Sequence, residues 1–170
     1  RETQISLALD LDGAGKVEIN TGIGFFDHML NLFAAQALFD LKLHATGDLH
    51  VDFHHTVEDA GICLGLALAE AGGDKVGIRR YGAAHVPLDE ALARTVVDFC
   101  GRSFLHFTHD LDGKFAGDFP GELVEDFLRA VCNNAKLTLH CDVLHGRNVH
   151  HINEVIFKSF GQALRQAVEK

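Results

Sequence analysis

The sequence is poor in several residue types, and each scarcity narrows the possible protein classes. It has no Trp, one Tyr and two Pro, and its four Cys include no CxxC pair. We therefore expect free, largely buried thiols in a reducing compartment, rather than a zinc ion held by Cys. The sequence also has no run of about 20 apolar residues and no signal-peptide pattern, which predicts a cytoplasmic protein without a membrane span.

Positive charge is scarce as well. The 15 Lys and Arg are outnumbered by 24 Asp and Glu, the formal charge is −9, and no basic run occurs. Neither nucleic acid nor an acidic membrane surface is therefore an expected partner, and a small molecule is favoured. A hydrophobic fraction of 47% excludes disorder, and 170 residues suffice for a full hydrophobic core.

Histidine, in contrast, is abundant, with twelve copies, and part of it lies in a repeated motif. The sequence HHTVE at 54–58 returns 96 residues later as HHINE at 150–154. Around both copies, an ungapped alignment contains nine identities in 28 positions. Self-similarity at one spacing indicates an internal repeat. We therefore predict two similar halves, residues 1–82 and 83–170, joined at 72–82.

Hydrophobic periodicity predicts the same order of elements in both halves. Strands are expected at 4–10 and 17–20, paired as a hairpin across the Gly-rich turn between them. The further elements of the first half are a helix at 25–38, a strand at 39–45 and a helix at 56–71. Those of the second half are strands at 83–87, 92–100 and 103–108, a helix at 122–135, a strand at 137–143 and a helix at 150–168. We predict an α+β fold in which each half is a mostly antiparallel sheet with two helices on one face.

The repeated motif has the spacing of a metal site. On a helix, the first His and the Glu of each copy are four residues apart and share a face. The two adjacent His cannot share that face, because a helix turns about 100° per residue. Each helix therefore offers ligands in two directions, and imidazole with carboxylate suits manganese, iron or zinc. The candidate ligands are His54, His55, Glu58, His150, His151 and Glu154.

Three other histidines have competing interpretations. His28 lies in FFDHML near the start of a helix, where it could be a core residue, a capping residue or a metal ligand. His44 and His140 alternate with leucines on expected strands, which favours hydrogen-bonded sheet histidines.

Several longer motifs resemble those of the imidazoleglycerol-phosphate dehydratase family of histidine biosynthesis, and the resemblance covers nearly the whole chain. They are GIGFFDHML at 22–30, RRYG at 79–82, PLDEAL at 87–92, DFCGR at 98–102 and LHGRNVHHINEVIFK at 144–158. The resemblance implies a lyase made of two α/β halves. It also implies a homo-oligomeric shell of 24 subunits, with two Mn²⁺ ions in each active site between subunits.

The resemblance also assigns roles to single residues. It adds His28 to the six candidate ligands. Where family members often have VEHF, this sequence has VEDF, which places Asp126 at a ligand position. Arg80, Arg102 and Lys158 match substrate-binding residues, and Glu2 matches both a substrate contact and the catalytic acid–base.

The implied reaction dehydrates D-erythro-imidazole-glycerol phosphate to imidazole-acetol phosphate. Its proton is lost from a carbon without an adjacent carbonyl, so another group must accept the electrons. Two metal ions on the two ring nitrogens would hold an imidazolate, which expels the hydroxyl through a diazafulvene-like intermediate. Two alternatives stay open from the residues: a binuclear hydrolase of a phosphate ester, and a non-enzymatic metal-storage cage.

Overall fold

The computed structural model describes residues 2–170, and every predicted helix and strand is present with bounds close to those expected. The first half contains β1 (Thr3–Asp10), β2 (Val17–Asn20), α1 (Gly24–Ala37), β3 (Asp40–Gly47) and α2 (His54–Gly72). The second half contains β4 (Tyr81–Leu88), β5 (Ala91–Asp98), β6 (Phe104–Thr108), β7 (Phe115–Ala116), β8 (Phe119–Pro120), α3 (Leu123–Ala135), β9 (Thr138–His145) and α4 (Val149–Val168). The short β7–β8 pair was not predicted.

The two main sheets have related topologies. The first has the order β1-β3-β2, and the second has the order β4-β5-β9-β6. In the first sheet, β3 is antiparallel to β1 and parallel to β2. In the second, β9 is likewise antiparallel to β5 and parallel to β6. The predicted α+β fold of two similar, mostly antiparallel halves is therefore confirmed, with β4 as an addition to the second half.

The predicted hairpin of β1 and β2 is wrong, because β3 lies between these strands and pairs with both. The loop that joins them is held by β3 rather than by a tight turn. One oxygen of the Asp40 carboxylate accepts hydrogen bonds from the backbone N–H groups of Ala14 and Lys16, each at 2.8 Å. The N–H of Leu41 in turn donates to the carbonyl of Lys16. Alternation identified both strands but carried no information about their partner.

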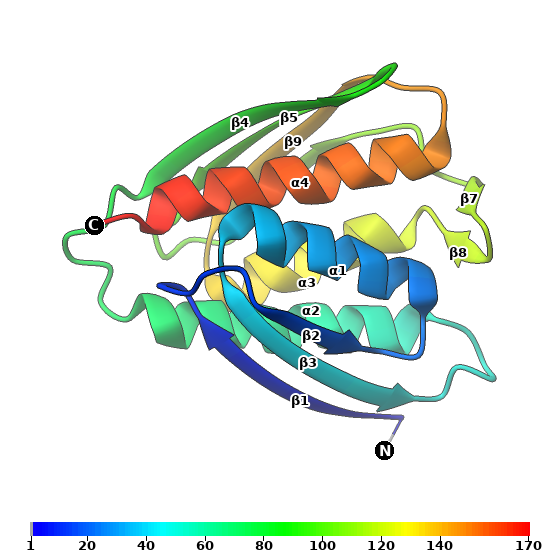
Figure 1. The fold of residues 1–170 in the computed structure, drawn as a ribbon, viewed down its shortest axis with the longest axis horizontal. Helices are drawn as coiled ribbons and strands as arrows, with labels where there is room; N and C mark the ends of the chain where they lie inside the picture. The colour runs from blue at the N-terminus through cyan, green and yellow to red at the C-terminus, as the bar shows by residue number, and fades with distance from the viewer. Residues whose placement is uncertain (1) are drawn as a thin grey trace.

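The four helices lie between the two sheets, so each sheet has helices on one face only (Figure 1). Helices α1 and α4 pack together, as do α2 and α3, so that each pair joins one helix from each half. Phe33 contacts Phe160 across the first pair, with ring centroids 5.0 Å apart. All of these helices begin at the same end of the molecule, on the right in Figure 1. One hydrophobic core therefore spans both halves.

Two repeated glycines explain how closely the helix pairs approach. A Cβ at Gly65 would meet Val131, Asn134 and Ala135 of α3. A Cβ at Gly161 would meet the corresponding residues of α1, namely Phe33, Gln36 and Ala37. Helices α2 and α4 thus correspond at the expected offset of 96 residues, whereas α1 and α3 correspond at an offset of 98.

The ungapped alignment is therefore two residues out of register before the second helix of each half. The backbone confirms the larger offset, since Phe39 bonds to Ala34 as Leu137 bonds to Cys132. The predicted division between residues 82 and 83 stays a prediction, and β4 runs across it.

The structure also bears on the expected state of the cysteines and on the expected absence of a membrane span. All four Cys are free thiols; Cys132 and Cys141 are buried, and burial raises the pKa of each to about 12. Cys63 and Cys100 are only partly buried. Among residues 2–170, no helix is both long enough and apolar enough to span a membrane. The cytoplasmic location stays a prediction.

Candidate metal and substrate site

The first candidate metal cluster joins α1 and α4. His28, His150 and Glu154 each offer one ligand atom, and these atoms lie within 4.8 Å of one another. The Nε2 atoms of His28 and His150 lie 3.0 and 2.9 Å from the same oxygen of Glu154, and Lys158 Nζ lies 2.6 Å from the other oxygen. Burial opposes ionisation of Glu154, but Lys158 and the two histidines outweigh it and lower its pKa to about 2.

The second cluster occupies the corresponding position between α3 and α2. The offset of 98 residues that relates α1 to α3 maps His28 onto Asp126, which faces the helix that carries His54 and Glu58. His54 Nε2 lies 3.5 Å from Glu58, and its Nδ1 lies 3.4 Å from Asp126. The two carboxylates thus approach different ring nitrogens. Asp126 therefore occupies the position equivalent to His28. The possible ligand atoms of the second cluster are less close together than those of the first cluster.

The second histidine of each pair points in a different direction from the first. His54 contacts Glu58 and Asp126, whereas His55 contacts Asp48. In the other pair, His150 contacts Glu154, whereas His151 contacts Glu90. This is the divergence expected of neighbouring side chains on a helix.

Two carboxylates hold these second histidines, and sequence reasoning missed both. Asp48 lies 2.8 Å from His55 Nδ1, and Glu90 lies 2.9 Å from His151 Nδ1. The hydrogen bond that His55 donates to Asp48 is the largest influence on the pKa of His55 and raises it. Asp48 follows β3 and Glu90 lies in the β4–β5 turn, so no spacing links either of them to its histidine.

Glu2, the expected acid–base, lies beside one of these histidines. Its carboxylate oxygen is 3.9 Å from His55 Nε2, and its side chain is 68% exposed. A carboxylate so placed is free to approach a substrate near His55.

The expected substrate-binding cations fall into two separate groups. Lys158 lies at the first cluster, but Arg80 is anchored at the other end of α4, where its N–H donates to the carbonyl of Ala167. At 1.5 Å per residue, Ala167 lies about 25 Å along the helix from His150. The Arg80 side chain forms a two-bond pair with Asp98, at 2.6 and 3.1 Å. A single chain therefore does not bring Arg80 to the clusters.

Arg102 is also at that far end. Its carbonyl accepts a hydrogen bond from Thr138, just beyond the end of α3, and its side chain is exposed. The prediction of hydrogen-bonded sheet histidines is confirmed for His44, which is 2.9 Å from Glu18. It is wrong for His140, whose side chain has no hydrogen-bond partner among residues 2–170 and instead contacts the rings of Phe104 and His106.

The donor set fits a divalent transition metal. The first cluster combines two imidazoles with a carboxylate, and the second combines one imidazole with two carboxylates. Such nitrogen and oxygen donors suit manganese, iron or zinc, while magnesium and calcium favour oxygen alone. Metal binding by the seven ligands expected from the motifs and by Asp126 stays a prediction.

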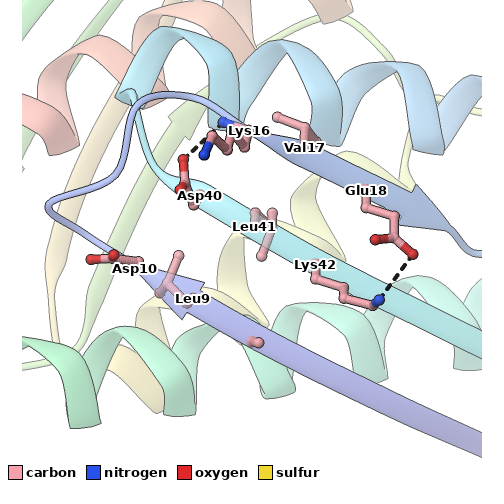
Figure 2. A pocket seen from close by; sticks show the side chains of 9 residues that line it. Leu9, Asp10, Lys16, Val17, Glu18, Asp40, Leu41 and Lys42 are labelled. Atoms are coloured by element: carbon pink, nitrogen blue, oxygen red, sulfur yellow. Dashed lines mark hydrogen bonds and ion pairs between the residues drawn. The ribbon is translucent and has the colours of Figure 1, made fainter.

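A separate hollow lies in the surface of the first sheet. It has a volume of about 450 Å³ and lies along β3, between the end of β1 and the start of β2 (Figure 2). Its lining includes Lys42, which is paired with Glu18 at 3.1 Å, and none of the candidate residues. The hollow is therefore not the candidate site.

Comparison with known proteins connects this geometry to a family. The family model described as imidazoleglycerol-phosphate dehydratase matches residues 21–164. The chain belongs to the imidazoleglycerol-phosphate dehydratase family. It is 54% identical to the imidazoleglycerol-phosphate dehydratase of Acetivibrio thermocellus, over 99% of this chain and 87% of that protein. It is also 54% identical to that of Hydrogenovibrio crunogenus, over 99% and 86%.

Two solved structures of imidazoleglycerol-phosphate dehydratases share the fold. The enzyme from Staphylococcus aureus has a TM-score of 0.91 and 44% identity, over 98% of this chain and 94% of that one. The enzyme from Pyrococcus furiosus in complex with (S)-C348 has a TM-score of 0.86 and 34% identity, over 100% and 91%. The predicted family and enzyme class, a hydro-lyase of histidine biosynthesis, are thus confirmed.

Proposed function

We propose that this chain dehydrates D-erythro-imidazole-glycerol phosphate to imidazole-acetol phosphate and uses two Mn²⁺ ions per active site. The observation that carries the proposal is the pair of corresponding clusters at the common end of the four helices. A storage protein has no need of two clusters with matched geometry, whereas a substrate ring with two nitrogens has a use for two ions.

The ligands fall into three sets. His28, His150 and Glu154 would hold one ion, and His54, Glu58 and Asp126 would hold the other. The second histidines, His55 and His151, face away from these clusters and would complete the sites of neighbouring copies. These residues would hold two Mn²⁺ ions, which would supply Lewis-acid stabilisation to the substrate ring.

The proton and the phosphate are handled by the side chains of the protein. Glu2 would take the proton from the substrate carbon and deliver a proton to the departing hydroxyl, since a carboxylate within reach can serve in both directions. Lys158, Arg80 and Arg102 would bind the phosphate through charge-assisted hydrogen bonds. Arg80 keeps part of its guanidinium free for this contact, because Asp98 occupies only Nε and one terminal nitrogen.

The separation of Arg80 and Arg102 from the clusters supports an active site shared between subunits. A small substrate cannot span about 25 Å of helix, so a second copy has to supply the arginines or the metal ligands. A closed shell of 24 copies, in which each contributes to several sites, would satisfy this requirement.

Subunit mixing tests the shared site. Arg80→Ala and Glu154→Ala chains should each be inactive alone, and co-assembled chains should regain activity through sites that take one intact part from each. Mixtures that stay inactive, although light scattering shows co-assembly, would rule out sharing.

The reaction itself is tested by incubating the manganese form with the substrate and following the enolisable ketone. Release of phosphate without the ketone would instead identify a hydrolase. Glu2→Gln should keep the manganese content and the assembly while abolishing turnover. Full activity in this variant would remove Glu2 from the mechanism.

A further inference from the structure

Both second histidines share one arrangement, although their partners come from unrelated positions. His55 faces the carboxylate of Asp48 at the end of β3, whereas His151 faces that of Glu90 in the β4–β5 turn. His55 and His151 correspond at the offset of 96 residues, and in both of them the carboxylate faces Nδ1.

Each of the two carboxylates presents one oxygen to its histidine. Glu90 uses one oxygen to accept from the backbone N–H groups of Arg147 and Asn148, at 3.1 and 2.7 Å, which leaves its other oxygen facing His151. The side chain of Asp48 is 15% exposed, and its second oxygen is buried without a partner among residues 2–170. At neutral pH a carboxylate has no proton to donate, so each of these side chains accepts a hydrogen bond from its histidine.

An acceptor at Nδ1 determines the tautomer of a neutral imidazole. The proton then resides on Nδ1, and the lone pair is left on Nε2, which is the atom that can bind a metal. We propose that Asp48 and Glu90 are positioning residues that hold His55 and His151 in the tautomer and orientation in which Nε2 binds a metal ion. This inference rests on the proposed function, because it concerns the same two ions.

The structure provides a sharp test at Glu90. In Glu90→Gln the amide oxygen should stay with the two backbone donors, which places the NH₂ group beside His151 Nδ1. The imidazole must then accept at Nδ1 and carry its proton on Nε2, where it blocks metal binding. Glu90→Ala removes the partner without imposing the wrong tautomer, but it also leaves the N–H groups of Arg147 and Asn148 without an acceptor.

We therefore expect Glu90→Gln to be the weaker manganese binder and Glu90→Ala to be the less stable variant. Glu90→Gln should lower the affinity of one of the two Mn²⁺ sites about 10- to 100-fold, at least as much as Glu90→Ala, while its Tm in the metal-free state stays above that of Glu90→Ala. Asp48→Ala should weaken the other site. Titration of free Mn²⁺ by electron paramagnetic resonance measures both affinities, and the absorption of Co²⁺-loaded protein reports the loss of a nitrogen ligand.

Glu18→Gln is the matched control. Glu18 also pairs with a histidine at 2.9 Å, but on the outer face of the first sheet, away from both clusters. The Glu18→Gln variant should leave the Mn²⁺ affinities of both sites unchanged. If the wild type binds two ions and Glu90→Gln binds both as tightly, the positioning role is overturned while the proposed function stands. It is also overturned if affinity follows stability, with Glu90→Ala the weaker binder. A wild type without two manganese sites would instead contradict the proposed function.

Discussion

Gly161→Ala tests whether the close approach of α4 to α1 shapes the first cluster. A Cβ at this position would lie 2.4 Å from the carbonyl oxygen of Phe33, 3.1 Å from Gln36 Cβ and 3.2 Å from the nitrogen of Ala37. Ordinary van der Waals contact begins at 3.4 Å, so the two helices must separate by about 1 Å. Backbone atoms form most of this contact and cannot move aside as a flexible side chain would.

The energetic cost follows from two opposed terms. Overpacking costs up to about 3 kcal/mol, and the better helix propensity of Ala returns about 1 kcal/mol. A net loss of about 2 kcal/mol should lower Tm by roughly 4–8 °C for a chain of this size. The same displacement moves His28 away from Glu154, and an error of about 1 Å at a reacting centre can cost about 100-fold in rate.

Thermal unfolding at one protein concentration measures the loss of stability. Manganese titration and an assay of turnover measure the effect on the cluster. Gly24→Ala is the control, since a Cβ there meets nothing within 4 Å. The reasoning is refuted if Gly161→Ala is as stable as the wild type and binds manganese equally well, because the helices would then tolerate a larger side chain at their contact.

Two further predictions concern other parts of the molecule. Asp126→Ala should lower Mn²⁺ affinity at the cluster of His54 and leave the His28 cluster unchanged; equal stoichiometry and affinity would make Asp126 an ordinary surface residue. Arg80 holds the pKa of Asp98 below its usual 3.8, so the pair stabilises the fold above that pH and loses its effect as the pH falls further. The stability difference between wild type and Asp98→Asn in urea should therefore shrink below about pH 3.8, and a difference independent of pH would contradict it.

The helices and strands were predictable from the sequence because each is determined by residues that are close together in the chain. The helices show apolar residues at three- and four-residue steps, and the strands alternate, so their bounds follow from short windows. The divergence of His54 and His55 also follows from helix geometry alone. The matched glycines, Gly65 and Gly161, marked equivalent positions correctly, because close helix packing constrains them in both halves.

Features that depend on distant parts of the chain were not predictable in this way. The position of β3 between β1 and β2 rests on contacts between distant residues, such as the hydrogen bond from Lys16 to Asp40, 24 residues apart. Glu90 reaches His151 over 61 residues, and no periodicity connects them. The distance of Arg80 from the clusters became apparent only once α4 was seen to run between them. The family motifs identified Arg80 as a candidate without showing that one chain cannot use it alone.

The two clusters occupy equivalent positions in the internal repeat, but their charges differ. In the first cluster the single carboxylate, Glu154, is paired with Lys158. The residue that corresponds to Lys158 in α2 is Ile62, and the second cluster has two carboxylates where the first has one. The second cluster is therefore the more negative and has fewer nitrogen donors, which favours a harder ion such as manganese over zinc. Asp126, the one ligand position at which the halves differ, is consequently the residue that should set the metal preference of its site.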